Sequence, residues 1–249
     1  MVIRGLRKVY GDPTRDGKVA VADLDLTVAR GSFFGLVGPN GAGKSTTLKM
    51  ATGLLRPDGG SVTVDGLDVW SDPGAVKARI GVVPEDLRLF ERLTGRELLE
   101  YTALLRGFER ADAVHRADQL LDVLGLGGDA RTLVLDYSSG MRKKIALGAA
   151  VLHRPSVLFL DEPFESVDPL SVRTLRAILE RLVDGGATVV FSSHVMEVVE
   201  RLCDHVAVVH AGRVVAEGPT AELCGGRRLE DVFVDAVGGP LGAVDLDWL

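Results

Sequence analysis

Residues 38–45 read Gly38-Pro-Asn-Gly-Ala-Gly-Lys44-Ser45, which matches the phosphate-loop pattern GxxxxGK[ST]. Glycines let the backbone curl so that successive N–H groups point inward at phosphate oxygens, and a following helix offers the positive end of its dipole to the same anion. Lys44 can reach the β- and γ-phosphates of a nucleotide, and the Ser45 hydroxyl can hold Mg²⁺. The stretch therefore predicts a site for ATP and Mg²⁺.

The flanking sequence has the order that this motif needs. SFFGLVG (32–38) is a continuous apolar run that ends in glycine, which is typical of a buried strand, and KSTTLKMATGLL (44–55) has helical spacing. A glycine-rich turn with a solvated lysine is the alternative, but the position between a strand and a helix favours the phosphate loop. The candidate nucleotide-binding residues here are Gly38, Pro39, Asn40, Gly41, Ala42, Gly43, Lys44, Ser45 and Thr46.

A second element is VLFLDEP (157–163), an apolar run that ends in Asp161 and Glu162. A buried strand that delivers two acids at its carboxyl end places them at the sheet edge where open α/β folds bind ligands. Asp161 would orient Mg²⁺ or its water, and Glu162 could polarise the attacking water. An acidic pair after a strand is often only a polar strand end, but the phosphate loop in the same chain favours the functional interpretation.

The remaining periodicity divides the chain into parts. From 2 to 37 the sequence reads as strands, and within it IRGLRKVY (3–10) and VAVADLDLTV (19–28) alternate apolar with polar residues, which predicts antiparallel strands. From about 86 to 153 leucines and alanines recur at helical spacing. Beyond 153 strand-like and helix-like runs alternate, as in a parallel sheet with crossover helices. The expected fold class is α/β, with a P-loop nucleotide-binding core, an N-terminal antiparallel β layer and a helical subdomain. Residues 225–249 show no clear period, and no structure is assigned to them.

Composition narrows the classes of function. The 249 residues carry a formal net charge of -6, which argues against a nucleic-acid binder held by a basic surface. Two cysteines, Cys203 and Cys224, are too few for a disulfide framework and fit a reducing cytoplasm. The N-terminus does not read as a signal peptide, and the apolar runs are far shorter than the ~20 residues of a membrane span. We therefore expect a cytoplasmic protein that acts at a membrane only as a peripheral partner.

A third motif is Tyr137-Ser138-Ser139-Gly140-Met141, before an expected helix that leads to the Asp161 strand. A serine–glycine pair that opens a helix is either another anion site or an ordinary helix cap. In this order the three motifs resemble those of the ATP-binding cassette (ABC) ATPases, whose signature is usually written LSGGQ. The resemblance runs from about Tyr10 to Glu217.

Further positions are similar to the same family. Ser166-Val167-Asp168 resembles its D-loop, although Asp168-Pro169 is also a good helix start. His194 resembles the switch histidine that contacts the γ-phosphate, and Tyr10 resembles the aromatic residue that stacks on adenine. The catalytic residues that the resemblance implies are Glu162, His194 and Lys44. It adds to the nucleotide-binding set Tyr10, Ser138, Ser139, Gly140 and Asp168. The implied metal ligands are Ser45, Glu85 and Asp161.

Two positions depart from the family pattern. Where the family usually has the glutamine of its Q-loop, this chain has Glu85, which adds negative charge beside the phosphates and cannot donate a hydrogen bond. Ser139 replaces a glycine of the signature, which removes some backbone freedom. These departures leave the metal geometry and the rate of hydrolysis as open questions.

The resemblance implies an ATPase domain at 1–224, with the helical subdomain at about 86–153 and a short tail at 225–249. Two copies, or one copy and a paralogous cassette, would close around two ATP-Mg. Each nucleotide would lie between the phosphate loop of one copy and residues 138–140 of the other. The dimer would drive an integral membrane permease from the inner face of the cell membrane. Export is the preferred direction by analogy; an importer subunit and a soluble non-transport ABC ATPase are the alternatives.

The surface that contacts the permease is expected beside Glu85. Four apolar residues follow it closely in the sequence: Leu87, Leu89, Phe90 and Leu93. They would either contact the permease or pack inside the helical subdomain, and the sequence favours neither interpretation.

Overall fold

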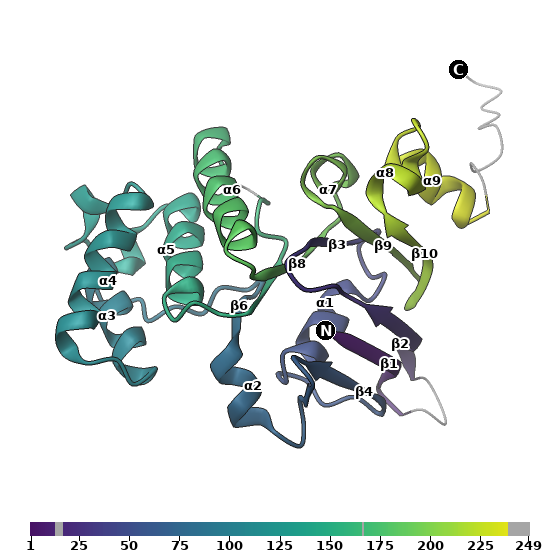
Figure 1. The fold of residues 1–249 in the computed structure, drawn as a ribbon, viewed down its shortest axis with the longest axis horizontal. Helices are drawn as coiled ribbons and strands as arrows, with labels where there is room; N and C mark the ends of the chain where they lie inside the picture. Colours follow the sequence, from purple (N-terminus) through teal and green to yellow (C-terminus); the bar gives the residue numbers. More distant parts are fainter. Residues whose placement is uncertain (13–16, 166, 239–249) are drawn as a thin grey trace.

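The computed structural model describes residues 1–12, 17–165 and 167–238, and Figure 1 shows two sheets with helices packed around and between them. Within these residues the central sheet has the strand order β10-β9-β3-β8-β7-β6. Strands β9, β3, β8, β7 and β6 run parallel, and β10 pairs with β9 antiparallel at one edge. The bounds are β3 (Phe33–Val37), β6 (Ile80–Val83), β7 (Val157–Asp161), β8 (Thr188–Ser193), β9 (His205–His210) and β10 (Arg213–Pro219).

The strands at the centre of this sheet are covered on both faces. Every residue of β3, β7 and β8 is buried, which explains why their sequences are continuous apolar runs. Because side chains alternate along a strand, Phe34 and Leu36 belong to one core, and Phe33 and Val37 belong to another. The three predicted strands at 32–38, 157–161 and 188–193 are confirmed.

The second sheet is antiparallel and forms the predicted N-terminal layer. Its strand order is β2-β1-β4-β5, and helix α1 (Lys44–Ala51) lies between it and the central sheet (Figure 1). The bounds are β1 (Val2–Tyr10), β2 (Lys18–Thr27), β4 (Gly59–Val64) and β5 (Leu67–Asp68). Four residues of the loop expected between the first two strands, 13–16, lie outside the described residues.

The helical subdomain stands to one side of both sheets (Figure 1). Its principal helices are α3 (Gly95–Leu105), α4 (Arg110–Val123) and α5 (Ser139–Val151), with short 3₁₀ turns η1 (Gly127–Asp129) and η2 (Val134–Asp136). Thr94 and Glu97 form a capping box at the start of α3, and the three helices share an apolar core. Helix α5 also packs against the central sheet, so it joins the two parts of the molecule. Among the described residues, no helix has the length and apolar character needed to span a bilayer.

The remaining helices cover the central sheet and its end, and one of them was not expected. The bounds are α2 (Pro73–Arg79), α6 (Pro169–Asp184), α7 (Met196–Leu202), α8 (Thr220–Cys224) and α9 (Leu229–Ala236). The sequence assigned no structure beyond 225, but α9 forms there because Leu229, Val232 and Phe233 lie on one face and pack against the core. Of the expected tail, 239–249 lies outside the described residues.

Candidate functional site

The phosphate loop connects β3 to α1 as the sequence predicts. Gly43 stands at the start of α1 with φ 107°, and a Cβ there would lie 2.4 Å from the Ala20 carbonyl oxygen. A Cβ at Gly38 would lie 2.1 Å from the Val209 carbonyl oxygen. At both positions only glycine fits, for reasons of backbone conformation and space, so the loop is held in one curled shape against β2 and β9.

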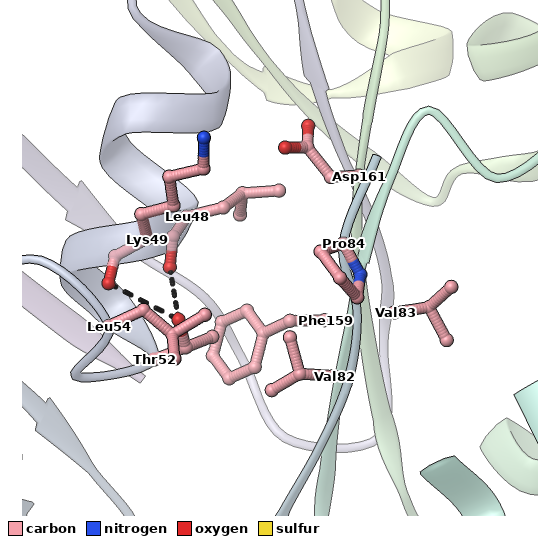
Figure 2. Close-up of a pocket in the computed structure, with 9 residues that line it drawn as sticks. All are labelled: Leu48, Lys49, Thr52, Leu54, Val82, Val83, Pro84, Phe159 and Asp161. Carbon is pink, nitrogen blue, oxygen red and sulfur yellow. Dashed lines mark hydrogen bonds between the residues drawn. The ribbon is translucent and has the colours of Figure 1, made fainter. Parts of the chain in front are cut away.

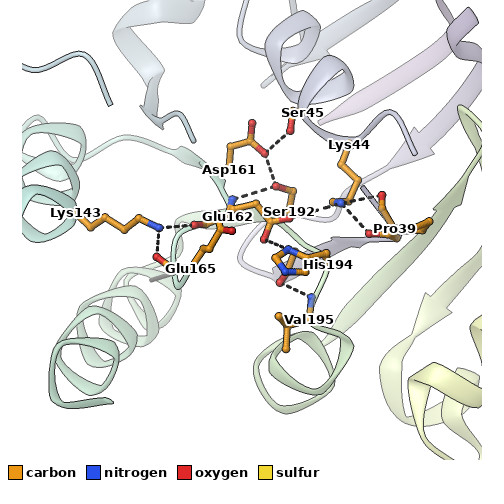
Figure 3. Close-up of polar contacts among 12 residues, drawn as sticks. Pro39, Lys44, Ser45, Lys143, Asp161, Glu162, Glu165, Ser192, His194 and Val195 are labelled. Carbon is orange, nitrogen blue, oxygen red and sulfur yellow. Dashed lines mark hydrogen bonds and ion pairs between the residues drawn. The ribbon is translucent and has the colours of Figure 1, made fainter. Parts of the chain in front are cut away.

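Lys44 is the buried cation of the site. Its side chain is 5% exposed, and Nζ donates to the carbonyl oxygens of Gly38 at 2.8 Å and Pro39 at 3.2 Å. Nζ also lies 3.6 Å from Oε1 of Glu162. The curled loop therefore holds its own lysine at its centre, beside Glu162, which directly follows β7 (Figure 3).

Asp161 and Ser45 form the oxygen pair of the site. Ser45 Oγ donates to Asp161 Oδ1 at 3.0 Å, and Ser192 Oγ donates to the same oxygen at 2.5 Å. Ser192 is the last residue but one of β8, and the sequence did not indicate it as a site residue. A hydroxyl and a carboxylate this close suit Mg²⁺, which prefers oxygen ligands and is usually held in proteins by one or two side chains. The donor set therefore fits the expected metal.

Glu162 is held by its backbone in an unusual conformation. Its φ is 50°, a left-handed value that is uncommon for a residue other than glycine, and its side chain is almost fully buried. Its N–H donates to Ser192 Oγ at 3.2 Å, and Oε2 lies 3.1 Å from Nδ1 of His194. Figure 3 shows the carboxylate between Lys44 and His194. Strain of this kind is retained where the surrounding structure imposes it, and it clusters at functional sites.

Of these side chains, Lys44, Ser45 and Glu162 line a cavity of about 310 Å³. Tyr10 lies at its rim, 44% exposed, and Glu85 also lines it. Two lining residues, Lys18 and Ala20 of β2, were not predicted. Lys18 adds a cation directly opposite Tyr10 in the β1–β2 pairing. A cavity with an aromatic rim, a glycine loop and buried Lys44 suits a nucleotide with its phosphates against the loop.

The predicted signature residues lie elsewhere. Ser138 accepts a hydrogen bond from the Met141 N–H and caps α5, and none of the cavity-lining residues described comes from 138–140. Gly140 lies beside Asp168, since a Cβ there would be 3.2 Å from Oδ2 of Asp168. Asp168 caps α6, and hydrogen bonds from Ser171 lower the pKa of its carboxyl. Ser166 of the expected D-loop lies outside the described residues. Because 138–140 contributes no described residue to the cavity lining, the signature and the phosphate loop form separate surfaces within one chain.

An apolar groove of about 580 Å³ runs between the side of α1 and the helical subdomain. Figure 2 shows a smaller pocket that shares residues with it, where the Phe159 ring lies between side chains of α1 and β6 and below Asp161. Leu87 and Leu89 line the groove and also pack against the cores, so their positions are compatible with both interpretations.

The other two apolar residues near the groove differ from each other. Leu93 packs against the helical core. Phe90 is 56% exposed and meets Tyr101 edge to face at 5.4 Å between ring centroids. Phe90 is thus the residue of the four whose position fits an outside contact best.

Comparisons with known proteins agree with this geometry. The ABC transporter family model matches residues 21–165. The chain is 44% identical over 219 residues to the daunorubicin/doxorubicin resistance ATP-binding protein DrrA of Streptomyces peucetius, covering 88% of this chain and 65% of the relative. It is 37% identical over 221 residues to the Nod factor export ATP-binding protein I of Cupriavidus metallidurans, covering 89% of this chain and 71% of that protein.

A solved structure described as the ATP binding subunit of an ABC transporter superposes with a TM-score of 0.85 at 29% identity, covering 95% of this chain and 98% of that one. The family model spans more than half of the chain, and the phosphate loop and Glu162 line one cavity. The chain belongs to the ABC transporter family, as an ATP-binding subunit.

Proposed function

We propose that this chain hydrolyses ATP at the cavity beside Lys44, with Glu162 as the general base, and that it thereby drives a membrane permease. The observation that carries the proposal is the convergence of Lys44, the Ser45–Asp161 pair and the Glu162–His194 pair at the carboxyl ends of three neighbouring strands. Phosphoryl transfer depends mainly on positioning and charge stabilisation, and this arrangement supplies both.

Each group has a separate role in the proposed reaction. The loop N–H groups and Lys44 bind the phosphate oxygens, and Tyr10 stacks on the adenine. Ser45 and Asp161, with Glu85 near them, would hold Mg²⁺, which would supply positive charge to neutralise part of the charge of the phosphates. Glu162 orients a water for attack, and His194 holds the γ-phosphate side of the cavity.

We infer that a complete site needs a second cassette. The segment 138–140 opens α5 with two exposed serines, and a helix N-terminus of this kind suits an anion. A head-to-tail dimer, of two copies or with a paralogous cassette, brings this segment over the phosphate loop of the partner. The separation of the two surfaces within one chain supports this assembly.

The permease is proposed to dock in the groove between α1 and the helical subdomain, which places the chain on the cytoplasmic face of the membrane. The groove supports this because its lining is mainly apolar, and because the smaller pocket that shares residues with it contains Phe159, two residues from Asp161 on β7. Export is the proposed direction, since relatives are described by drug resistance and by Nod factor export. The transported substrate would be chosen by the permease.

The test uses Glu162→Gln. This variant should bind ATP as the natural chain does, whereas turnover should fall by about 10³-fold because an amide cannot accept the proton. Glu180→Gln, the same change on exposed α6, is the matched control and should keep full activity. Turnover at the natural rate in Glu162→Gln would refute the base assignment.

The same variant tests the partner. In a pull-down with ATP present, the tagged Glu162→Gln variant should recover a polytopic membrane protein from detergent-solubilised membranes of the source cell. A solute-binding protein in the complex would indicate import. Recovery of ribosomes or other soluble material without a membrane protein would exclude the transport role and leave the ATPase assignment intact.

A further inference from the structure

Lys143 of α5 reaches from the helical subdomain to the segment that carries the proposed catalytic base. Its Nζ donates to the main-chain carbonyl oxygen of Glu162 at 2.9 Å and also to that of Glu165 (Figure 3). It does not line the nucleotide cavity. This side chain is therefore a direct polar link from α5 to the loop that follows β7.

The link matters because of the backbone at Glu162. With φ at 50°, this residue is in a conformation that the surrounding structure must impose. Its N–H is held by Ser192 of β8, and its carbonyl is held by Lys143 of α5. The two peptide groups that flank the Glu162 side chain are therefore fixed from different parts of the molecule, one from the central sheet and one from the helical subdomain.

The three carboxylates around Lys143 come from two segments. Burial lowers the pKa of its ammonium group, and the carboxylates of Glu165, Glu162 and Glu85 act against that shift. Glu85 follows β6, and the other two follow β7. Glu85 is also the residue that departs from the family pattern at the Q-loop. The negative charge that it adds beside the cavity interacts with the ammonium group of Lys143.

We propose that Lys143 is a positioning residue for hydrolysis: it fixes the main chain at Glu162 from α5, so that the orientation of the helical subdomain sets the position of the carboxylate. This rests on the proposed role of Glu162 as the base. The α5 helix begins with the 138–140 segment, so the helix that would meet the partner's nucleotide also holds the acid that acts in its own site.

The experiment compares Lys143→Met with Lys143→Arg in the full chain by steady-state ATP hydrolysis. Loss of the donor should lower kcat by about 10- to 100-fold with KM for ATP changed by no more than about 3-fold, because misplacing a catalytic group by about 1 Å has effects of this size. Arginine can still donate to both carbonyls and should retain kcat within about 3-fold. Arg176→Met, which removes an exposed cation from α6, is the control.

A second readout separates positioning from plain structural support. Because Lys143 acts through Glu162, Lys143→Met in the Glu162→Gln background should cause no further loss of the residual turnover, whereas effects of independent origin add. Additive losses, or natural kcat in folded Lys143→Met, would overturn the proposal. If Lys143→Met does not fold, Lys143→Gln takes its place. Its amide can still donate hydrogen bonds but is shorter and uncharged, which predicts an intermediate kcat. A kcat equal to that of the natural chain would again contradict the proposal.

The two proposals fail in different ways. Natural turnover in Glu162→Gln removes the base assignment itself. Lost turnover in Glu162→Gln together with natural turnover in Lys143→Met or Lys143→Gln removes only the role of Lys143.

Discussion

The phosphate-loop half of the molecule and the signature half are built in different ways. At the phosphate loop, Lys44, Asp161 and Glu162 are buried, and each has polar partners from other strand ends of the same sheet. At 138–140 the serines are exposed, and Ser138 is held by its own helix cap. The first half is organised within one chain, and the second presents groups to a partner. The comparison teaches that the fold fixes half a site firmly and leaves the other half to be positioned by assembly.

The largest expected effect tests this comparison with two inactivating variants, one from each half, which are then mixed. Lys44→Ala should lower kcat/KM by about 10³-fold because the buried cation for the phosphates is lost. Ser138→Asp keeps a helix-capping side chain but places a negative charge towards the partner's phosphates, and it should lower turnover by about 10²-fold.

Mixing the two inactive variants is the informative measurement. A head-to-tail heterodimer of the two variants has one site with both changes and one site with natural Lys44 and natural Ser138. ATP hydrolysis per heterodimer should therefore return to as much as half of that of the natural dimer. No recovery, with heterodimers demonstrated by differential tags, would contradict the shared site.

A second contrast concerns one glycine from each half. Gly43→Ala meets both the positive φ and the Ala20 carbonyl oxygen, and it should lower the free energy of unfolding by about 2–4 kcal/mol. Gly140→Ala has an ordinary helical backbone and only the movable Asp168 carboxylate nearby, so its stability should change by less than about 1 kcal/mol. Thermal melting of the two purified variants measures this; equal losses would show that the signature half is as rigidly packed as the loop.

The smallest expected effect concerns Glu85, which lies between the halves. Glu85→Gln removes an exposed negative charge from the lining of the cavity, and KM for ATP should fall by about 2- to 3-fold at low salt and less at high salt. A titration of Mg²⁺ at saturating ATP sharpens the result. An increased Mg²⁺ requirement would indicate that Glu85 serves the metal instead of repelling the nucleotide.

The sequence predicted the parts of the site that follow from strand order. Lys44, Ser45, Asp161 and Glu162 were expected to meet because the phosphate loop follows one recognisable buried strand and the two acids stand at the end of another, and the structure brings them together. His194 follows from the same rule at the end of β8 and lies against Glu162 as expected.

What the sequence did not reveal depends on packing. Ser192 is one of two serines at a strand end, and only the register of β7 with β8 shows which one meets Asp161. Lys143 is one of three consecutive basic residues, and its role depends on how α5 sits against the loop after β7. Strand β6 has only four residues, too few for a periodic signal, and α9 is short with its apolar spacing among acids.

Strand β7 carries Phe159 and Asp161 on the same side, two residues apart, so the ring in the small pocket beside the apolar groove and the carboxylate proposed to hold Mg²⁺ belong to one strand. If the permease docks in the groove as proposed, the binding of nucleotide and the binding of permease are linked thermodynamically. If occupancy of the groove changes the affinity for ATP-Mg by some factor, then bound ATP-Mg must change the affinity of the groove for its occupant by the same factor. A permease that promotes nucleotide binding will, by this reciprocity, be held most tightly by the ATP-loaded subunit.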